Sequence, residues 1–134
     1  MRLKDLLNGI YPANVARECE SLEITAIDCD SRKVQKGSLF IAVSGTKTDG
    51  IRFVEEAVKK GAVCVAKPRT QPLEPSSFPK ICILDVDDPK AFLKAATLRF
   101  YKNPTNDVRT VAVTGTNGKT TTTYLIENIL KVAK

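Results

Sequence analysis

The chain reads RTVAVTGTNGKTTTTY at residues 109–124. An apolar run comes first, a loop with two glycines follows, and an amphipathic stretch comes next. This order predicts a short buried strand at 109–114, a phosphate-binding loop, and a helix at 121–134. Glycines allow successive backbone N–H groups to point to one side, where they and the helix N-terminus can hold anionic oxygens. The apolar residues expected to face inward on the helix are Leu125, Ile126, Ile129 and Leu130.

The loop carries the side chains that nucleotide phosphates require. Lys119 is expected to reach the β- and γ-phosphates as a point charge, and the Thr120 hydroxyl is expected to be a ligand of Mg²⁺. The loop departs from the generic G-x-x-x-x-G-K-[ST] pattern, because Val113 stands at the first glycine position. The alternative is a plain strand-to-helix turn with an exposed lysine. The residues expected to contact ATP are Gly115, Thr116, Asn117, Gly118, Lys119, Thr120 and Thr121.

Hydrophobic spacing predicts the elements that precede this loop, and their alternation favours an α/β fold. Asp88-Pro89 is a helix-start signal, because an N-cap residue is followed by proline. Continuous apolar runs predict strands buried on both faces at 62–66 and 81–86. The other expected elements are a helix at 2–8, strands at 23–29 and 38–43, and helices at 52–60 and from 89 to about 101. The inward faces of the last two helices are expected to hold Phe53, Val54, Ala57 and Val58, and Phe92, Ala95, Ala96 and Phe100.

A polar segment divides the chain into two parts. Residues 102–107 read KNPTND, a composition typical of a linker, between two stretches that each have their own apolar pattern. We therefore expect one domain at 1–103 and the start of a second at 104–134.

Composition excludes several classes of protein. The 134 residues include no histidine, which removes a Ser-His-Asp triad and a histidine general base. The four cysteines form no C-x-x-C pair, so reduced core thiols are expected rather than a zinc site. Neither a membrane-length apolar run nor a signal peptide is present, so we expect a cytoplasmic protein without membrane insertion. The net charge is +6, but the basic residues form no long run, which favours a phosphate-rich small ligand over nucleic acid.

Two segments resemble a known family. GTNGKTTTTYLI at 115–126 resembles the phosphate loop of the Mur ligases, the ATP-dependent amide-forming enzymes of peptidoglycan synthesis. The segment at 24–68, with its DSR-x-V-x-x-G-x-LF-x-A pattern, is similar to the UDP-sugar-binding domain of the MurE type, which adds the third peptide residue. The MurF type shares much of this pattern but usually has another residue at the position of Asn117. One departure is Ile51-Arg52, where the family often has histidine.

The resemblance implies a fold and a domain order. A small N-terminal UDP-sugar-binding domain would be followed by the first strand, phosphate loop and helix of the ATPase domain. The family also has a complete central domain and a C-terminal domain. The chain would therefore be an N-terminal fragment, with the acidic Mg²⁺ ligands and the amino-acid pocket beyond residue 134.

The resemblance also places substrate contacts in the first domain. Ser31 matches the serine that contacts UDP, and Cys29, with its side chain expected in the core, stands at a neighbouring contact position. The second UDP-binding loop is matched by Thr46, Lys47 and Thr48. From the residues alone, Asp30 and Ser31 could instead bond the backbone of a local turn, and residues 46–48 could form an exposed turn. Arg32 could pair with Asp28 or Asp30 rather than with a phosphate.

The implied activity is ATP-dependent ligation of a third amino acid to UDP-N-acetylmuramoyl-L-Ala-D-Glu. The dipeptide carboxylate would attack the γ-phosphate, become an acyl phosphate and then react with the incoming amine, with Lys119 as a catalytic residue. The alternatives are a MurF-type ligase, a non-catalytic UDP-sugar-binding module and a regulatory P-loop NTPase. The sequence leaves open the oligomeric state and whether the third residue is diaminopimelate, lysine or another amine.

Overall fold

The chain divides into two units, Met1–Asn103 and Pro104–Lys134. The computed structural model describes residues 1–10, 15–45, 49–74 and 77–133. None of the helices in these ranges has the length and apolar character that a membrane crossing requires.

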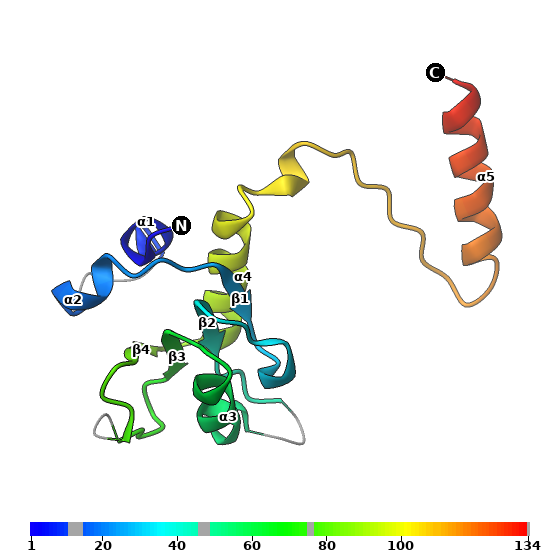
Figure 1. Cartoon of the computed structure of the whole chain (residues 1–134). Helices are drawn as coiled ribbons and strands as arrows, with labels where there is room; N and C mark the ends of the chain where they lie inside the picture. Colours follow the sequence, from blue (N-terminus) through cyan, green and yellow to red (C-terminus); the bar gives the residue numbers. More distant parts are fainter. Residues whose placement is uncertain (11–14, 46–48, 75–76, 134) are drawn as a thin grey trace. The chain divides into compact units, whose positions relative to one another are not determined.

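The first unit is built on a four-stranded parallel sheet (Figure 1). The strands lie in the order in which they occur along the chain. They are β1 (Ala26–Asp28), β2 (Ser38–Ile41), β3 (Cys64–Pro68) and β4 (Cys82–Val86). All pairings are parallel, which confirms the predicted α/β fold class. Each strand was expected from its hydrophobic pattern. The strand β1 differs most from its prediction, because it keeps only three of the seven predicted residues.

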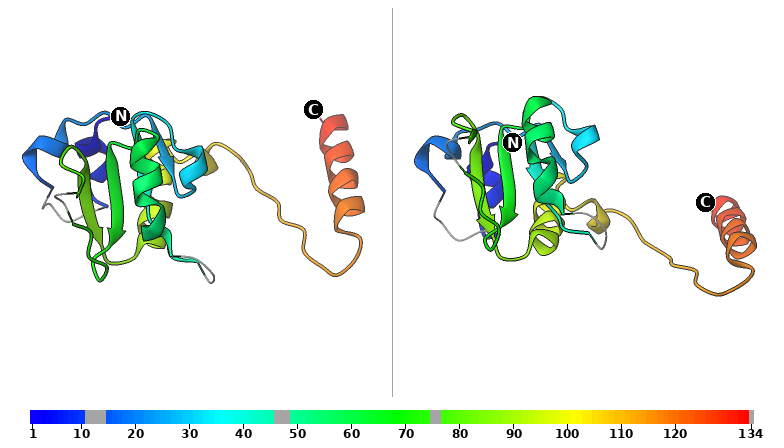
Figure 2. Two further views of the ribbon diagram at one scale, coloured as in Figure 1. Left: turned by 60° about the horizontal axis from the view of Figure 1, so that its bottom comes forward. Right: turned by 90° about the horizontal axis from the view of Figure 1, so that it is seen from below.

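Helices cover both faces of this sheet (Figure 2). The α-helices of the first unit are α1 (Leu3–Leu7), α2 (Arg17–Glu20), α3 (Val54–Lys59) and α4 (Pro89–Phe100). Two 3₁₀ turns, η1 (Ser31–Lys33) and η2 (Gly50–Phe53), precede the second strand and the third helix. The start signal at Asp88 is confirmed, since its carboxylate accepts hydrogen bonds from the amides of Lys90 at 2.8 Å and Ala91 at 3.1 Å.

The core has two parts because alternate strand residues point to opposite faces. In β2, Leu39 and Ile41 pack with α1 and α4, whereas Phe40 packs with α3 on the other side. The strand β3 is buried on both faces, as expected. The same expectation is wrong for β4, where Asp85 reaches solvent, because β4 is the edge strand and one of its faces is only partly covered.

One apolar residue of the third helix does not face inward as predicted. Val54 and Ala57 are buried, but Phe53 is 38% exposed. The reason is local, since Phe53 ends the 3₁₀ turn η2 and so lies outside the regular helical spacing that starts at Val54. Its exposure gives the neighbouring surface an aromatic ring.

The second unit contains a 3₁₀ turn, η4 (Pro104–Asn106), and a long helix, α5 (Lys119–Val132). The helix is confirmed, but the predicted strand at 109–114 is wrong: in the described part of this unit no strand pairs with these residues, and an unpaired strand is not stable. The prediction of an inward apolar face is wrong for three of its four residues, whereas Ile126 is half-buried. Ile129 is 66% exposed, and Leu125 and Leu130 are exposed to a similar degree.

Candidate functional site

A pocket opens beside the turn that follows β1. It has a volume of about 480 Å³ and lies between η1 and the start of α3. The residues that line it are Cys29, Asp30, Ser31, Arg32, Phe53 and Glu56. We refer to it as the Ser31 pocket. Two predicted substrate residues, Cys29 and Ser31, therefore lie in one cavity.

Ser31 is held by a residue from the opposite wall of the pocket. Its side chain is buried, and its hydroxyl donates a 2.7 Å hydrogen bond to Oε2 of Glu56. Lys60 donates to the other carboxylate oxygen at 2.9 Å. The Lys60 ammonium and, second, the Ser31 hydroxyl lower the pKa of Glu56, so the carboxylate stays charged. The Ser31 proton is thus committed to Glu56, and its lone pairs remain as acceptors for a ligand donor.

Asp30 and Arg32 form the rim of the Ser31 pocket. The Asp30 carboxylate accepts from the Arg32 backbone amide at 3.0 Å and pairs with the Arg32 guanidinium through contacts of 2.9 and 2.8 Å. These bonds hold the pKa of Asp30 at about 2. The local-turn interpretation is confirmed for Asp30, and Arg32 pairs with Asp30 rather than with Asp28. The Arg32 side chain is nevertheless 81% exposed, so the guanidinium remains accessible to an anion.

Cys29 departs from the core placement that was expected for its side chain. The residue is exposed and lines the pocket, because β1 ends at Asp28 and the chain turns outward there. Phe53 presents an exposed aromatic ring on the same pocket. An aromatic face, a guanidinium, a carboxylate and hydroxyl lone pairs together form a surface suited to a planar base, a sugar hydroxyl and a phosphate.

A second feature fixes the segment that leads into α3. The Asp49 carboxylate accepts from the Ser44 hydroxyl at 2.9 Å and from the side-chain amide of Gln71 at 2.6 Å. The Ser44 hydrogen bond is the largest cause of the lowered pKa of Asp49. Next to it, Gly50 lies so close to the end of β2 that an added Cβ would sit 2.6 Å from the backbone N and O of Val43. The predicted contacts Thr46, Lys47 and Thr48 lie outside the described residues.

The predicted phosphate loop has one of its two expected flanking elements. Gly118, at φ +75°, leads directly into α5, and no side chain among the described residues caps that helix. The first intrahelical bond is donated by the Thr122 amide to the Gly118 carbonyl at 2.9 Å. The amides of residues 119–121 therefore point out of the helix N-terminus, where an anion is favoured.

Lys119 bends back over this loop. Its ammonium donates to the carbonyl of Gly115 at 2.6 Å and to that of Thr116 at 3.3 Å. The ammonium is therefore held at the loop that leads into α5. Thr120 is exposed in the first turn of α5, so a cation that accompanies a phosphate group at this helix end could reach its hydroxyl.

Comparison with known proteins identifies the family. Residues 23–101 match the model described as "Mur ligase family, catalytic domain". The chain belongs to the Mur ligase family. The matched residues include β1 to β4, the Ser31 pocket and all of α4, so the family assignment rests on the same unit that forms the pocket.

Relatives within the Mur ligase family have a more specific name. Over 131 residues the chain is 40% identical to the UDP-N-acetylmuramoyl-L-alanyl-D-glutamate--2,6-diaminopimelate ligase of Caldanaerobacter subterraneus, with 98% of this chain and 26% of that protein covered. The ligase of the same name from Geobacter metallireducens is 41% identical, with 97% and 24% covered. The chain thus spans about a quarter of the length of these relatives.

The fold of this chain also resembles that of solved Mur ligase structures. The UDP-N-acetylmuramoylalanyl-D-glutamyl-2,6-diaminopimelate--D-alanyl-D-alanyl ligase of Acinetobacter baumannii has a TM-score of 0.59 at 28% identity, covering 81% of this chain and 23% of that one. The MurF ligase of Thermotoga maritima in complex with ADP has a TM-score of 0.55 at 28% identity, covering 82% and 23%.

Sequence reasoning missed two residues of the Ser31 pocket. Glu56 lies 25 residues from Ser31 along the chain. In the sequence it stands four residues before Lys60, which is the spacing of an ordinary solvent-exposed ion pair on a helix. Phe53 was assigned to the core from its helical spacing. Only the close approach of η1 to α3 shows that both line the pocket, and no local motif carries that information.

Proposed function

We propose that this chain provides the nucleotide-sugar-binding part of a MurE-type ligase. The substrate would be UDP-N-acetylmuramoyl-L-Ala-D-Glu, and the added third residue would be diaminopimelate. The observation that carries the proposal is the 40% identity, over nearly the whole chain, to relatives whose name states this reaction. The resemblance of the DSR segment to the UDP-sugar-binding domain supports the same substrate.

In this proposal the Ser31 pocket binds the uridine end of the precursor. Ser31 would accept a hydrogen bond from the ligand, since its own proton is donated to Glu56. Arg32 would offer its exposed guanidinium to the diphosphate, and Cys29 would contact the ligand at the pocket wall. Further contacts from Thr46, Lys47 and Thr48 are proposed from the resemblance alone.

ATP would bind at the start of α5. The uncapped amides, the positive φ of Gly118 and the ammonium of Lys119 fit a nucleotide phosphate group. Bound ATP would supply the phosphoryl group that activates a carboxylate for amide formation. Gly115, Thr116, Asn117 and Thr121 would contact its phosphates, Lys119 would neutralise developing charge, and Thr120 would hold Mg²⁺.

A MurF-type ligase is the second candidate. It is favoured by the solved structures, whose names include D-alanyl-D-alanyl ligase and MurF. Their sequence identity of 28% is lower than the 40% of the diaminopimelate ligases, which is why the MurE type comes first. The two candidates differ in the precursor that they bind, a UDP-linked dipeptide or a UDP-linked tripeptide.

Titration calorimetry with the UDP-linked dipeptide and tripeptide tests the proposal on the 134-residue chain. We expect binding of the dipeptide precursor, and Ser31→Ala should weaken it by roughly 2- to 12-fold, the effect of losing one hydrogen bond. The exposed Ser77→Ala is the matched control and should bind like the parent. Equal binding by Ser31→Ala and the parent would remove Ser31 from the site, and tighter binding of the tripeptide would favour the MurF type.

A further inference from the structure

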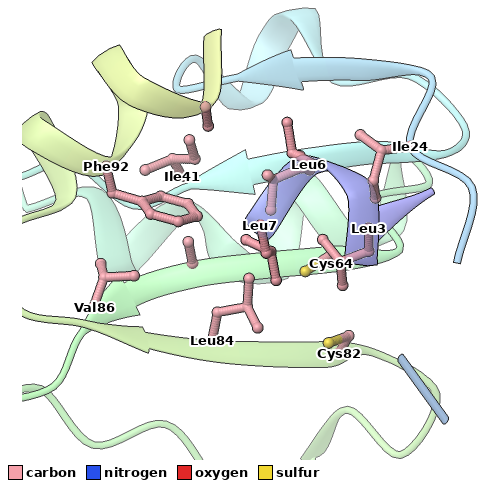
Figure 3. Close-up of a cluster of buried hydrophobic side chains, with 13 residues drawn as sticks. Leu3, Leu6, Leu7, Ile24, Ile41, Cys64, Cys82, Leu84, Val86 and Phe92 are labelled. Carbon is pink, nitrogen blue, oxygen red and sulfur yellow. The ribbon is translucent and has the colours of Figure 1, made fainter. Parts of the chain in front are cut away.

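Among the described residues of the first unit, three have buried polar side chains, namely Ser31, Ser38 and Lys67. None of them belongs to the cluster between the sheet, α1 and α4, which consists of aliphatic, aromatic and cysteine side chains (Figure 3). Ser38 both donates and accepts a hydrogen bond, and the Lys67 ammonium has two oxygen partners. Ser31, by contrast, lines a pocket, and no described residue donates to its hydroxyl oxygen. The lone pairs of this buried oxygen are therefore open to a ligand in the pocket.

The hydrogen bond between Ser31 and Glu56 has only one possible direction. Lys60 donates to Oε1 of Glu56 at 2.9 Å and is the largest cause of the lowered pKa of this carboxyl group. Glu56 is therefore ionised near neutral pH, and a carboxylate only accepts hydrogen bonds. The Ser31 hydroxyl donates its one proton to Oε2 at 2.7 Å, so it has none left for a ligand. Glu56 thus makes Ser31 a pure hydrogen-bond acceptor toward the pocket.

Charge decides which part of a nucleotide can lie beside Ser31. Glu56 lines the pocket whereas Lys60 does not, so the wall next to Ser31 presents a carboxylate. A phosphate at this wall would face a like charge, and the exposed guanidinium of Arg32 at the rim is the favourable position for it. The uncharged part of the nucleotide then lies at Ser31, where the exposed ring of Phe53 can stack on a planar base.

We propose that Glu56 is a specificity-determining residue that selects uracil over cytosine by making Ser31 an acceptor. This inference rests on the proposed function, in which the Ser31 pocket holds the uridine end of the precursor. In a uracil ring joined to ribose, N3–H is the one polar donor, and Ser31 accepts its hydrogen bond. Cytosine in the same position turns the lone pair of N3 toward the lone pairs of Ser31, which leaves both acceptors without a donor.

Replacement of Glu56 by glutamine should reverse the direction of this hydrogen bond. The Lys60 ammonium can only donate, so it selects the carbonyl oxygen of the glutamine amide. The amide nitrogen then faces Ser31 and donates to its oxygen, which frees the hydroxyl proton for the ligand. The Glu56→Gln chain therefore presents a donor to the base and favours the N3 lone pair of cytosine. Glu56→Ala leaves Ser31 free to donate or to accept, so it should bind both bases alike.

Titrations of the 134-residue chain with UDP and with CDP, followed by backbone NMR, test the proposal. We expect the parent to prefer UDP by about 5- to 150-fold, the cost of an unpaired buried acceptor. Glu56→Gln should lower this preference by at least about 5-fold. Ser31→Ala should abolish it, because neither base then faces a serine oxygen.

Glu55→Gln is the matched control for the loss of charge. Glu55 lies on the same helix, pairs with Lys59 at 2.6 Å and does not line the pocket. The Glu55→Gln chain should therefore keep the parent's preference for UDP. Circular dichroism of each variant checks that the fold is retained, and Glu56→Ala is the second variant of the same position.

Two results would contradict this inference alone. One is equal affinity of the parent for UDP and CDP, which would place Ser31 against the ribose or diphosphate that both nucleotides share. The other is an unchanged preference for UDP in folded Glu56→Gln and Glu56→Ala chains. Absence of binding of both nucleotides to the parent would overturn the proposed function together with this inference.

Discussion

Replacement of Gly50 by alanine tests how the Ser31 pocket is held against the sheet. A Cβ at this position would lie 2.6 Å from both the N and O atoms of Val43 and 2.7 Å from the carbonyl carbon of Ala42. All three are backbone atoms of the two residues that follow β2, so no side-chain rotation can relieve the contact. The chain around Gly50 must therefore move away from the strand by about 1 Å to reach ordinary contact distances.

The expected loss of stability follows from the size of this clash. Overpacking of a well-packed site costs about 1–3 kcal/mol, and 1 kcal/mol corresponds to about 4–8 °C in Tm for a domain of the size of the first unit. We expect Gly50→Ala to lower the Tm of the first unit by about 4–24 °C, and to weaken binding at the Ser31 pocket because η2 carries Phe53.

Thermal unfolding followed by circular dichroism, together with urea titration, measures this loss. Gly9→Ala is a comparison variant without overpacking. Among the described residues its Cβ would meet the Arg99 side chain at an ordinary 3.9 Å, so its expected cost is the strain of a positive φ, about 1–2 kcal/mol. A Gly50→Ala protein that melts within about 2 °C of the parent would refute the reasoning, because the observed packing then could not be the packing in solution.

Two further predictions concern charge. Asp30 has a folded-state pKa of about 2 against an ordinary value of 3.8, so its ion pair with Arg32 stabilises the fold above pH 3.8, and this stability is lost as the pH falls toward 2. Asp30→Asn should therefore flatten the pH–stability curve between these values. A curve that Asp30→Asn leaves unchanged would exclude the ion pair as the cause of this pH dependence. In a full-length ligase that carries this chain, Lys119→Ala should lower kcat by about 10³-fold with little change in binding of the UDP-linked precursor, while Lys131→Ala should behave like the parent. A comparable loss in precursor binding would contradict the separate positions of the two sites along the chain.

The sequence predicted those parts of the fold that local patterns determine. Hydrophobic patterns located all four strands, and the Asp88-Pro89 signal located the start of α4, because burial and capping depend on residues close together in sequence. Phe53 was misplaced because a 3₁₀ turn shifts it out of helical register. The strand at 109–114 was wrong for a different reason, since an apolar run forms a strand only beside a partner.

In the candidate site, too, local features were predictable from the sequence and features that depend on distant residues were not. The DSR motif indicated the Ser31 region, and the glycine pattern indicated the loop before α5, because both are local arrangements of backbone and polar side chains. Glu56 could not be found in this way, since its approach to Ser31 depends on the packing of α3 against η1. The exposure of Cys29 likewise depends on where β1 ends, which its apolar neighbours did not indicate.

Backbone NMR spectra of the 134-residue chain during titration with UDP test the central claim most directly. Binding at the Ser31 pocket predicts chemical-shift changes that saturate with UDP and are concentrated at residues 28–32 and 53–56, with smaller changes in Ser31→Ala. Uridine should reproduce the changes near Phe53 but not those near Arg32, because it lacks the diphosphate. Shift changes confined to the β4–α4 end of the sheet, or none at roughly millimolar UDP, would contradict the account.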